Sequence, residues 1–342
     1  MKTAVVICPG RGTYNKTELG YLGQHFPEPA LLADFDAQRR AEGQAPVSVL
    51  DGAERFSMSE HTRGDNASAL IFASSLGDFL SVNRDEIEIV AVTGNSMGWY
   101  TALACAGALS ASDGFRVANT MGTLMQRSLI GGQLVYPFTD EDWHARPERQ
   151  SELVGLVHDI AARPDLELCV SIELGGMLVL AGNENGLKAF EAAVEPVQQR
   201  FPMRLGNHAA FHTPLVAPVS AEGKASLSPS LFRSPAIPMI DGRGHVWWPG
   251  ACDPAAIHAY TLGTQVVETY NFTRAIAVAA REFAPDHFIV AGPGNTLGGA
   301  VAQSLILAGW LGMRSKADFV ATQQARGLLV SMGLAEQRGL VC

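Results

Sequence analysis

Short apolar runs alternate with longer segments of helical periodicity along most of this chain. Residues 3–8, 88–93 and 287–291 are short runs rich in β-branched residues, and a glycine or proline follows each of them. Such runs are typical of buried strands. The spacing of apolar residues predicts five helices, at 67–80, 97–107, 112–129, 272–283 and 316–332. Since strands alternate with helices, we expect an α/β fold with a parallel sheet.

The rhythm changes between residues 131 and 206. Here the pattern predicts strands at 133–138, 168–173, 177–181 and 202–205, with helices at 152–162 and 185–198. The resulting order, β-α-β-β-α-β, is that of a ferredoxin-like subdomain. We therefore expect a large body made of residues 1–130 and 207–342, with residues 131–206 inserted as one wall of a cleft. The Ser- and Pro-rich segment 226–238 is expected to be a loop.

Composition and charge exclude several classes of protein. The 342 residues are 47% apolar and 17% charged, which supports a packed core and about two domains. The net charge of −9 argues against nucleic acid or an anionic membrane as the main partner. The five cysteines are odd in number and show no CxxC spacing. This usage favours a reducing cytoplasm over a disulfide framework or a zinc site.

One long stretch needs to be tested as a membrane span. No Asp, Glu, Lys or Arg occurs between His287 and Met313, a length that would cross a bilayer. Pro293 and six glycines interrupt the stretch, however, so a buried strand, a loop and a helix are the better prediction. The N-terminal apolar run is too short for a signal peptide. We expect no membrane association.

Two glycine clusters lack the residues that nucleotide binding needs. Gly10-Arg11-Gly12 follows the first strand, but Asn15 occupies the third glycine position of a dinucleotide-binding turn. The cluster that starts at Gly292 has neither the lysine nor the hydroxyl pair of a P-loop. Both read as tight turns at strand ends, where ligands lie in open α/β sheets. We expect no bound cofactor and no metal.

The strongest chemical signal is the pentapeptide Gly94-Asn95-Ser96-Met97-Gly98. It is a GxSxG sequence that follows an apolar strand and precedes a helix, which is the context that a nucleophile elbow requires. The turn would present Ser96 at a helix N-terminus, where free backbone N–H groups can stabilise an oxyanion. Ser96 is therefore the candidate nucleophile.

A serine nucleophile needs a base. His212 is the first candidate, because Pro214 and its apolar neighbours indicate a helix start that could direct the imidazole into a cleft. The residues alone leave His208, His245 and His287 open as alternatives.

Five ordered blocks resemble the malonyl-CoA:acyl-carrier-protein transacylases and the acyltransferase domains of polyketide synthases. Residues 9–12 resemble the PGQG block, 94–98 the GHSxG elbow, and 210–215 the AFHSPL block that carries the catalytic histidine. Gln265, eight residues before Thr273, is similar to the glutamine whose backbone carbonyl orients that histidine. Residues 292–294 resemble a late GPG turn. The resemblance extends from about residue 3 to residue 310.

The resemblance implies a fold, a mechanism and a partner. The fold would be a hydrolase-like parallel-sheet body with an inserted ferredoxin-like subdomain. Ser96 would attack an acyl-CoA with His212 as base and Gln265 as its orienting group, while the N–H groups of Arg11 and Met97 form the oxyanion hole. The phosphopantetheine thiol of acyl carrier protein would then take the acyl group in fatty-acid or polyketide synthesis. Malonyl is the acyl group that the family implies.

Several positions depart from the family pattern around the acyl group. Met121 stands where the family has an arginine that binds the malonyl carboxylate. Asn95 replaces the histidine of the elbow, and Arg11 replaces the glutamine of PGQG. Together with Phe211, these residues are the expected substrate contacts. Because Met121 is apolar, we expect acetyl or another uncharged acyl group to compete with malonyl, unless Arg11 supplies the cation.

Three other functions fit parts of the same pattern. A thioesterase acting on acyl carrier protein or acyl-CoA would use the same Ser–His pair with water as acceptor. A serine esterase would use a different triad, Ser96, Asp241 and His287. A non-catalytic module would only bind the carrier protein. Carrier binding would need a local basic face, for which the candidates are Lys188, Arg200, Arg204, Arg274, Arg314 and Lys316.

Overall fold

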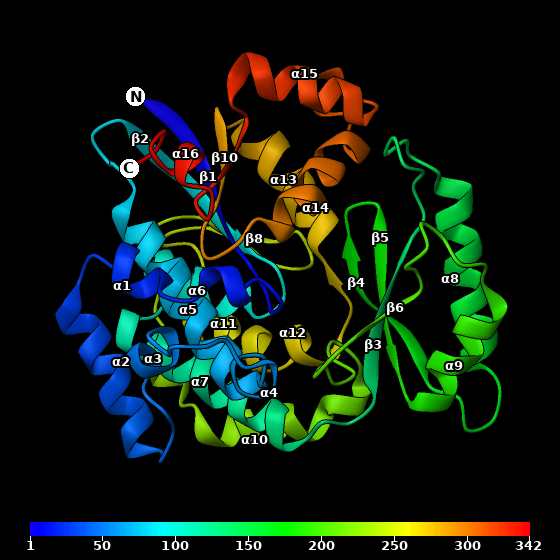
Figure 1. Cartoon of the computed structure of the whole chain (residues 1–342), viewed down its shortest axis with the longest axis horizontal. Helices are drawn as coiled ribbons and strands as arrows, with labels where there is room; N and C mark the ends of the chain where they lie inside the picture. Colours follow the sequence, from blue (N-terminus) through cyan, green and yellow to red (C-terminus); the bar gives the residue numbers. More distant parts are fainter.

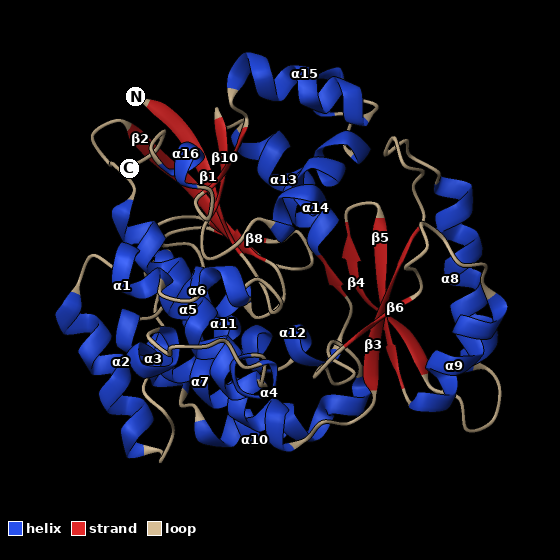
Figure 2. Cartoon of the chain, viewed as in Figure 1, coloured by secondary structure: helices blue, strands red, loops and turns tan.

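The computed structural model describes residues 1–342 and contains two β-sheets surrounded by helices (Figures 1 and 2). In the larger sheet, five strands run parallel and the last pairs antiparallel with its neighbour. In spatial order these strands are β11 (Leu329–Ser331), β10 (His287–Val290), β1 (Lys2–Cys8), β2 (Ile87–Gly94), β7 (Met239–Ile240) and β8 (Val246–Trp247).

The centre of this sheet is apolar because it is covered on both faces. Ala4 to Cys8 of β1 have no exposed surface, and Val6 of β1 lies beside Val92 of β2 and Ile289 of β10. Fully buried parallel strands are expected to be continuous apolar runs. The three strands predicted in the large body are thus confirmed.

Sixteen α-helices surround or connect the sheets. They are α1 (Tyr21–His25), α2 (Pro29–Ala41), α3 (Val47–Asp51), α4 (Met58–His61), α5 (Gly64–Ser81), α6 (Gly98–Cys105), α7 (Ala111–Arg127), α8 (Pro147–Ala161), α9 (Glu184–Ala193), α10 (Ala217–Ser226), α11 (Pro254–Leu262), α12 (Thr264–Val267), α13 (Phe272–Phe283), α14 (Thr296–Leu307), α15 (Lys316–Arg326) and α16 (Ala335–Arg338). Four 3₁₀ turns lie at Lys16–Glu18 (η1), Pro214–Val216 (η2), Pro229–Leu231 (η3) and Trp310–Gly312 (η4).

Several helices begin at polar residues that satisfy their free N–H groups. The side chain of Ser110 accepts a hydrogen bond from Asp113 N at the start of α7, and Asn271 accepts one from Arg274 N at the start of α13. Such caps contribute about 1 kcal/mol each. With α5 and α6, helix α7 forms the layer beside the nucleophile candidate, and α6 packs on β1 and β2.

The smaller sheet has the order β6 (Met203–Leu205), β3 (Gly132–Pro137), β5 (Met177–Gly182), β4 (Leu168–Leu174) and β9 (Tyr270–Asn271). Its first four strands pair antiparallel, and α8 and α9 cover one face (Figure 2). This is the arrangement of a ferredoxin-like unit, so the predicted fold class is confirmed. Strand β9 lies outside residues 131–206 and pairs parallel with β4, which joins the unit to the body.

Two predicted helices end earlier than the apolar pattern suggests. The helix expected at 316–332 stops at Arg326, because Gly327 adopts a left-handed conformation (φ 60°), and residues 329–331 form β11 instead. The helix expected at 185–198 stops at Ala193, since Pro196 disfavours helical backbone at the residue before it.

The stretch between His287 and Met313 contains β10, a glycine-rich turn, α14 and η4, as predicted. None of the helices combines the length and apolar character that crossing a bilayer requires.

Candidate active site

Ser96 lies in a sharp turn between β2 and α6. Its backbone adopts φ 55°, a strained conformation for a residue with a side chain. A Cβ at Gly98 would overlap the carbonyl oxygen of Cys8, and one at Gly94 would lie 2.6 Å from the backbone nitrogen of Trp99. Only glycine fits at both positions. The turn is therefore pressed against the end of β1, as a nucleophile elbow is.

The hydroxyl of Ser96 faces an imidazole. Ser96 Oγ lies 2.8 Å from His212 Nε2, and His212 Nδ1 lies 2.6 Å from the carbonyl oxygen of Gln265. A carbonyl oxygen can only accept, so Nδ1 carries the proton and Nε2 is free to accept the serine proton. Like Ser96, His212 has left-handed backbone (φ 58°). The three residues form a relay in which a backbone carbonyl takes the place of a carboxylate.

Gln265 also fixes the elbow through its side chain. Its Nε2 donates to the carbonyl oxygen of Ser96 (3.0 Å), and its Oε1 accepts from the hydroxyl of Tyr100 (3.1 Å). One residue of α12 thus holds both His212 and the Ser96 turn. Any shift of α12 would move both groups together.

Burial keeps the imidazole neutral. The low-polarity surroundings lower the pKa of His212 from 6.5 to about 4, while its hydrogen bond to Gln265 acts in the opposite direction. At pH 7 the imidazole is neutral, with its one proton on Nδ1 and none on Nε2. It can therefore take a proton from Ser96.

Two backbone N–H groups near Ser96 are free to bind an oxyanion. The N–H groups of Arg11 and Met97 donate to no backbone carbonyl. Met97 immediately precedes α6, where the positive end of the helix dipole lies. These are the two residues whose N–H groups the family resemblance implies for the oxyanion hole.

A small pocket adjoins Ser96 and His212. Its volume is about 40 Å³. Its thirteen lining residues are Arg11, Gly64, Ser68, Ser96, Met97, Tyr100, Met121, Gly122, Met125, Phe211, His212, Gln265 and Val266. None of them lies between residues 131 and 206, so the inserted segment does not line this pocket.

The inserted segment instead forms hydrogen bonds with the loop that carries His212. Ser171 of β4 donates to the carbonyl oxygen of Phe211 (2.7 Å) and accepts from Gln133 of β3 (2.7 Å). Gln133 Oε1 in turn lies 2.7 Å from Nδ1 of His208. This buried chain fixes the residue next to His212. The sequence did not single out Gln133 or Ser171, although polar residues within apolar strands are a usable signal.

Of the four residues predicted to contact substrate, three line the pocket and one does not. Met121, Phe211 and Arg11 line it. Asn95 does not; it is buried in the elbow, where its backbone N–H donates to the carbonyl of Cys8 (2.9 Å). Met121 is 1% exposed and supplies an apolar wall where the resembling family has an arginine.

The alternative base and acid lie outside the pocket. Nδ1 of His287 lies 2.8 Å from the carbonyl oxygen of Gly327. Asp241 accepts hydrogen bonds from Arg243 (2.6 Å) and from the indole of Trp247 (3.1 Å). The structure does not bring the esterase triad together. No group of three or more His, Cys, Asp or Glu side chains is arranged to hold a metal ion.

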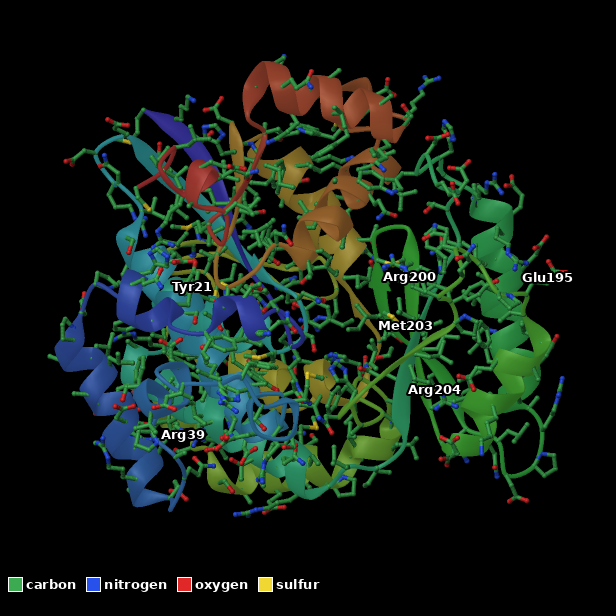
Figure 3. All side chains as sticks on the ribbon, in the orientation of Figure 1. Tyr21, Arg39, Glu195, Arg200, Met203 and Arg204 are labelled. Atoms are coloured by element: carbon green, nitrogen blue, oxygen red, sulfur yellow. The ribbon has the colours of Figure 1, made fainter.

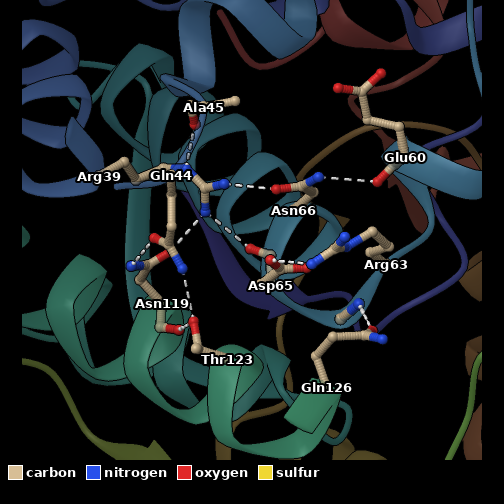
Figure 4. A network of polar contacts seen from close by, with 11 residues as sticks. Arg39, Gln44, Ala45, Glu60, Arg63, Asp65, Asn66, Asn119, Thr123 and Gln126 are labelled. Atoms are coloured by element: carbon tan, nitrogen blue, oxygen red, sulfur yellow. Dashed lines mark hydrogen bonds and ion pairs between the residues drawn. The ribbon is translucent and has the colours of Figure 1, made fainter. Parts of the chain in front are cut away.

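A buried arginine orders the pocket wall formed by α5 and α7 (Figure 4). Arg39 of α2 is fully buried and donates to Oδ1 of Asn66 (2.5 Å), to Oδ1 of Asn119 (2.6 Å) and to the carbonyl of Asp65 (2.9 Å). These bonds fix the first turn of α5 against α7. Gly64, in that same turn, lines the pocket. Sequence reasoning missed this network.

The fold agrees with that of known transacylases. An acyl-carrier-protein S-malonyltransferase from Burkholderia pseudomallei superposes with a TM-score of 0.75 at 20% identity and covers 99% of both chains. The chain has the transacylase fold. The resemblance found in the sequence is thereby confirmed. A type II polyketide synthase malonyl-transacylase, solved in complex with its acyl carrier protein, superposes with a TM-score of 0.72 at 17% identity and covers 95% of this chain and all of that one.

The sequence is also similar to those of proteins named malonyl CoA-acyl carrier protein transacylase. Malonyl CoA-acyl carrier protein transacylase of Salmonella typhimurium is 24% identical over 211 residues, or 61% of this chain. The match spans 63% of the relative's own length. No protein-family model matches the chain.

Proposed function

We propose that this protein transfers a short acyl group from coenzyme A to the phosphopantetheine thiol of an acyl carrier protein through an acyl-serine intermediate. The observation that carries the proposal is the relay from Ser96 Oγ through His212 to the carbonyl of Gln265. A neutral imidazole at 2.8 Å from the hydroxyl is placed as a general base must be.

Both half-reactions use the same groups. In the first, His212 takes the proton of Ser96 while Oγ attacks the thioester carbonyl, and the oxyanion is held by the N–H groups of Arg11 and Met97. The carbon–sulfur bond breaks, and the CoA thiolate leaves with the proton from His212. In the second, the carrier thiol gives its proton to His212 and attacks the acyl-serine, and Ser96 recovers a proton. Malonyl is the acyl group that the names of the relatives support.

An acyl carrier protein is the proposed acceptor, by analogy with the neighbour solved in complex with its carrier. Two of the predicted basic candidates are already paired with acids on this chain: Lys188 with Glu184 (3.3 Å), and Arg204 with Glu191 (2.6 Å). Arg200 lies near β6, close to Met203 and Arg204 (Figure 3), and is exposed without an acidic partner. Arg200, together with exposed Arg274 and Arg314, is therefore the better choice for attracting an acidic carrier.

Trapping of the acyl-enzyme tests the proposal. We expect incubation with acyl-CoA to add one acyl mass, and peptide mapping to place the adduct on Ser96. Ser96→Ala should abolish the adduct, whereas Ser68→Ala, which removes the other serine of the pocket, should retain it. His212→Ala should slow acylation by several orders of magnitude, and His287→Ala should not. An adduct that survives in Ser96→Ala would refute the assignment.

A further inference from the structure

The two N–H groups proposed for the oxyanion hole differ in how their backbone is fixed. Met97 immediately precedes α6, and its carbonyl oxygen accepts from the N–H of Tyr100 (3.0 Å), so its backbone is part of the helix. Arg11 lies in the loop after β1, and neither its N–H nor its carbonyl oxygen bonds to another backbone group. Gly12 follows it with φ 92°, in open space. Backbone hydrogen bonds therefore do not fix the N–H of Arg11.

The side chain of Arg11 attaches this loop to two distant segments. Its Nη2 donates to the carbonyl oxygen of Thr62 (3.0 Å), shortly before α5, and to that of Asn207 (2.9 Å), directly after the inserted segment. Nδ2 of Asn207 in turn donates to Oγ1 of Thr62 (2.7 Å). The guanidinium carbon also lies 5.5 Å from the centre of the Phe211 ring. Three segments that are far apart in the sequence thus meet at one guanidinium.

The guanidinium of Arg11 is enclosed by protein. Nε and Nη1 have no exposed surface and no hydrogen-bond partner, and Nη2 already donates to two carbonyl oxygens. No donor of Arg11 is therefore available to an acyl carboxylate. Burial lowers the pKa of Arg11 to about 10, so the group is charged at pH 7. Because a charged donor forms stronger hydrogen bonds than a neutral one, the two bonds of Nη2 fix the loop firmly.

We propose that the side chain of Arg11 positions the backbone N–H of the same residue in the oxyanion hole. This inference rests on the proposed acyl transfer. Such a donor stabilises the oxygen that becomes negative when Ser96 attacks only if it is fixed in place beforehand. A misplacement of about 1 Å can cost about a hundredfold in rate. Arg11 is thus a positioning residue, because its guanidinium contacts no substrate but prevents the loop from moving about Gly12.

The experiment measures single-turnover acylation of Ser96 by malonyl-CoA and by propionyl-CoA in wild type and in Arg11→Met, which lacks the donors. We expect the maximal rate constant to fall about ten- to a hundredfold with both substrates, because one half of the oxyanion hole is displaced. The concentration of acyl-CoA that gives half the maximal rate should change by less than about twofold, since the ground state has no oxyanion. Arg116→Met, on the exposed side of α7, is the matched control and should keep the wild-type rate.

A second measurement separates oxyanion binding from a general loss of structure. A trifluoromethyl ketone analogue of acyl-CoA adds reversibly to a serine nucleophile, and the oxygen of the adduct occupies the oxyanion hole, whereas CoA itself places no oxygen there. In Arg11→Met the affinity for the ketone should fall by about the same factor as the rate constant, while the affinity for CoA stays within about twofold. Circular dichroism verifies the fold. If Arg11→Met does not fold, Arg11→Lys takes its place; it keeps the charge but not the planar fork, and should lose about three- to tenfold in rate.

Three results would overturn the proposal. The first is a rate constant within about twofold of wild type in the folded variant. The second is a loss confined to malonyl-CoA, since the guanidinium would then act on the acyl group. The third is an equal loss of affinity for the ketone and for CoA, since the side chain would then only support the fold. No acylation of wild type by any acyl-CoA would instead contradict the proposed acyl transfer, and this inference with it.

Discussion

The pH dependence of acylation follows directly from the burial of His212. His212 is 4% exposed, and its pKa is lowered from 6.5 to about 4. At about 1.4 kcal/mol per pH unit, this difference corresponds to about 3 kcal/mol against protonation in the folded chain. Ser96 needs the neutral imidazole, so the acylation rate should stay level from pH 8 down to about 5.5 and become half-maximal only near the lowered pKa.

The same shift affects stability, with a definite sign. Between the two pKa values the unfolded chain binds a proton at His212 and the folded chain does not, so the free energy of unfolding decreases as pH falls from about 6.5 toward about 4. His208, whose pKa is about 3, acts in the same direction. The contribution of these two histidines to stability approaches its full value as pH rises above 6.5.

Intact-mass measurement of acyl-enzyme at timed intervals, between pH 5 and 8, provides the assay. Circular dichroism at each pH verifies that the protein is folded where the rate is read, and His287→Gln serves as a control for an uninvolved histidine. A rate that falls by half near pH 6.5 would refute the reasoning, because the base would then be an ordinary, solvated imidazole.

Three further predictions test the elbow, the core and the carrier-binding surface. Gly98→Ala should abolish acylation and lower the free energy of unfolding by about 1–3 kcal/mol or more, measured by urea denaturation, since its methyl group overlaps backbone at the end of β1. Asp78→Asn should cost about 3–5 kcal/mol in the same assay, because Asp78 is fully buried and paired with Arg338 at 2.5 Å; a cost below 1 kcal/mol would contradict the pairing. Arg200→Glu with Arg274→Glu should raise the KM for carrier protein and leave acylation by acyl-CoA unchanged; equal effects on both would count against docking at these residues.

Local patterns sufficed to predict the main elements and the elbow. Ser96 could be found because strand, GxSxG and helix follow one another within a few residues, and the turn needs glycine at two fixed positions. His212 needed the resemblance to a family, since its distance from Ser96 in the chain is 116 residues and no spacing rule joins them. The role proposed for Gln265 belongs to a backbone carbonyl, which any residue type provides.

Contacts between distant segments were not predictable from local patterns. Met121 could be singled out from the sequence because it stands where the resembling family has an arginine. Only the structure reveals that two donors of Arg11 are buried without partners. Arg39 was overlooked because a single arginine in a polar helix usually faces solvent, whereas here α5 and α7 close over it. The apolar pattern continues past Gly327 through the three residues of β11, and it therefore predicts a helix where the structure has a strand.

Transfer of the acyl group from isolated acyl-enzyme tests the central claim most directly. The acylated protein is freed of CoA, and one portion is kept in buffer while the other is mixed with holo acyl carrier protein. The masses of both proteins are then followed over time by intact-mass spectrometry. We predict that the adduct on Ser96 persists in buffer and disappears with carrier protein, which gains the same mass on its phosphopantetheine thiol. Loss of the adduct at equal rates in both, with no mass gained by the carrier, would contradict acyl transfer and identify the protein as a thioesterase.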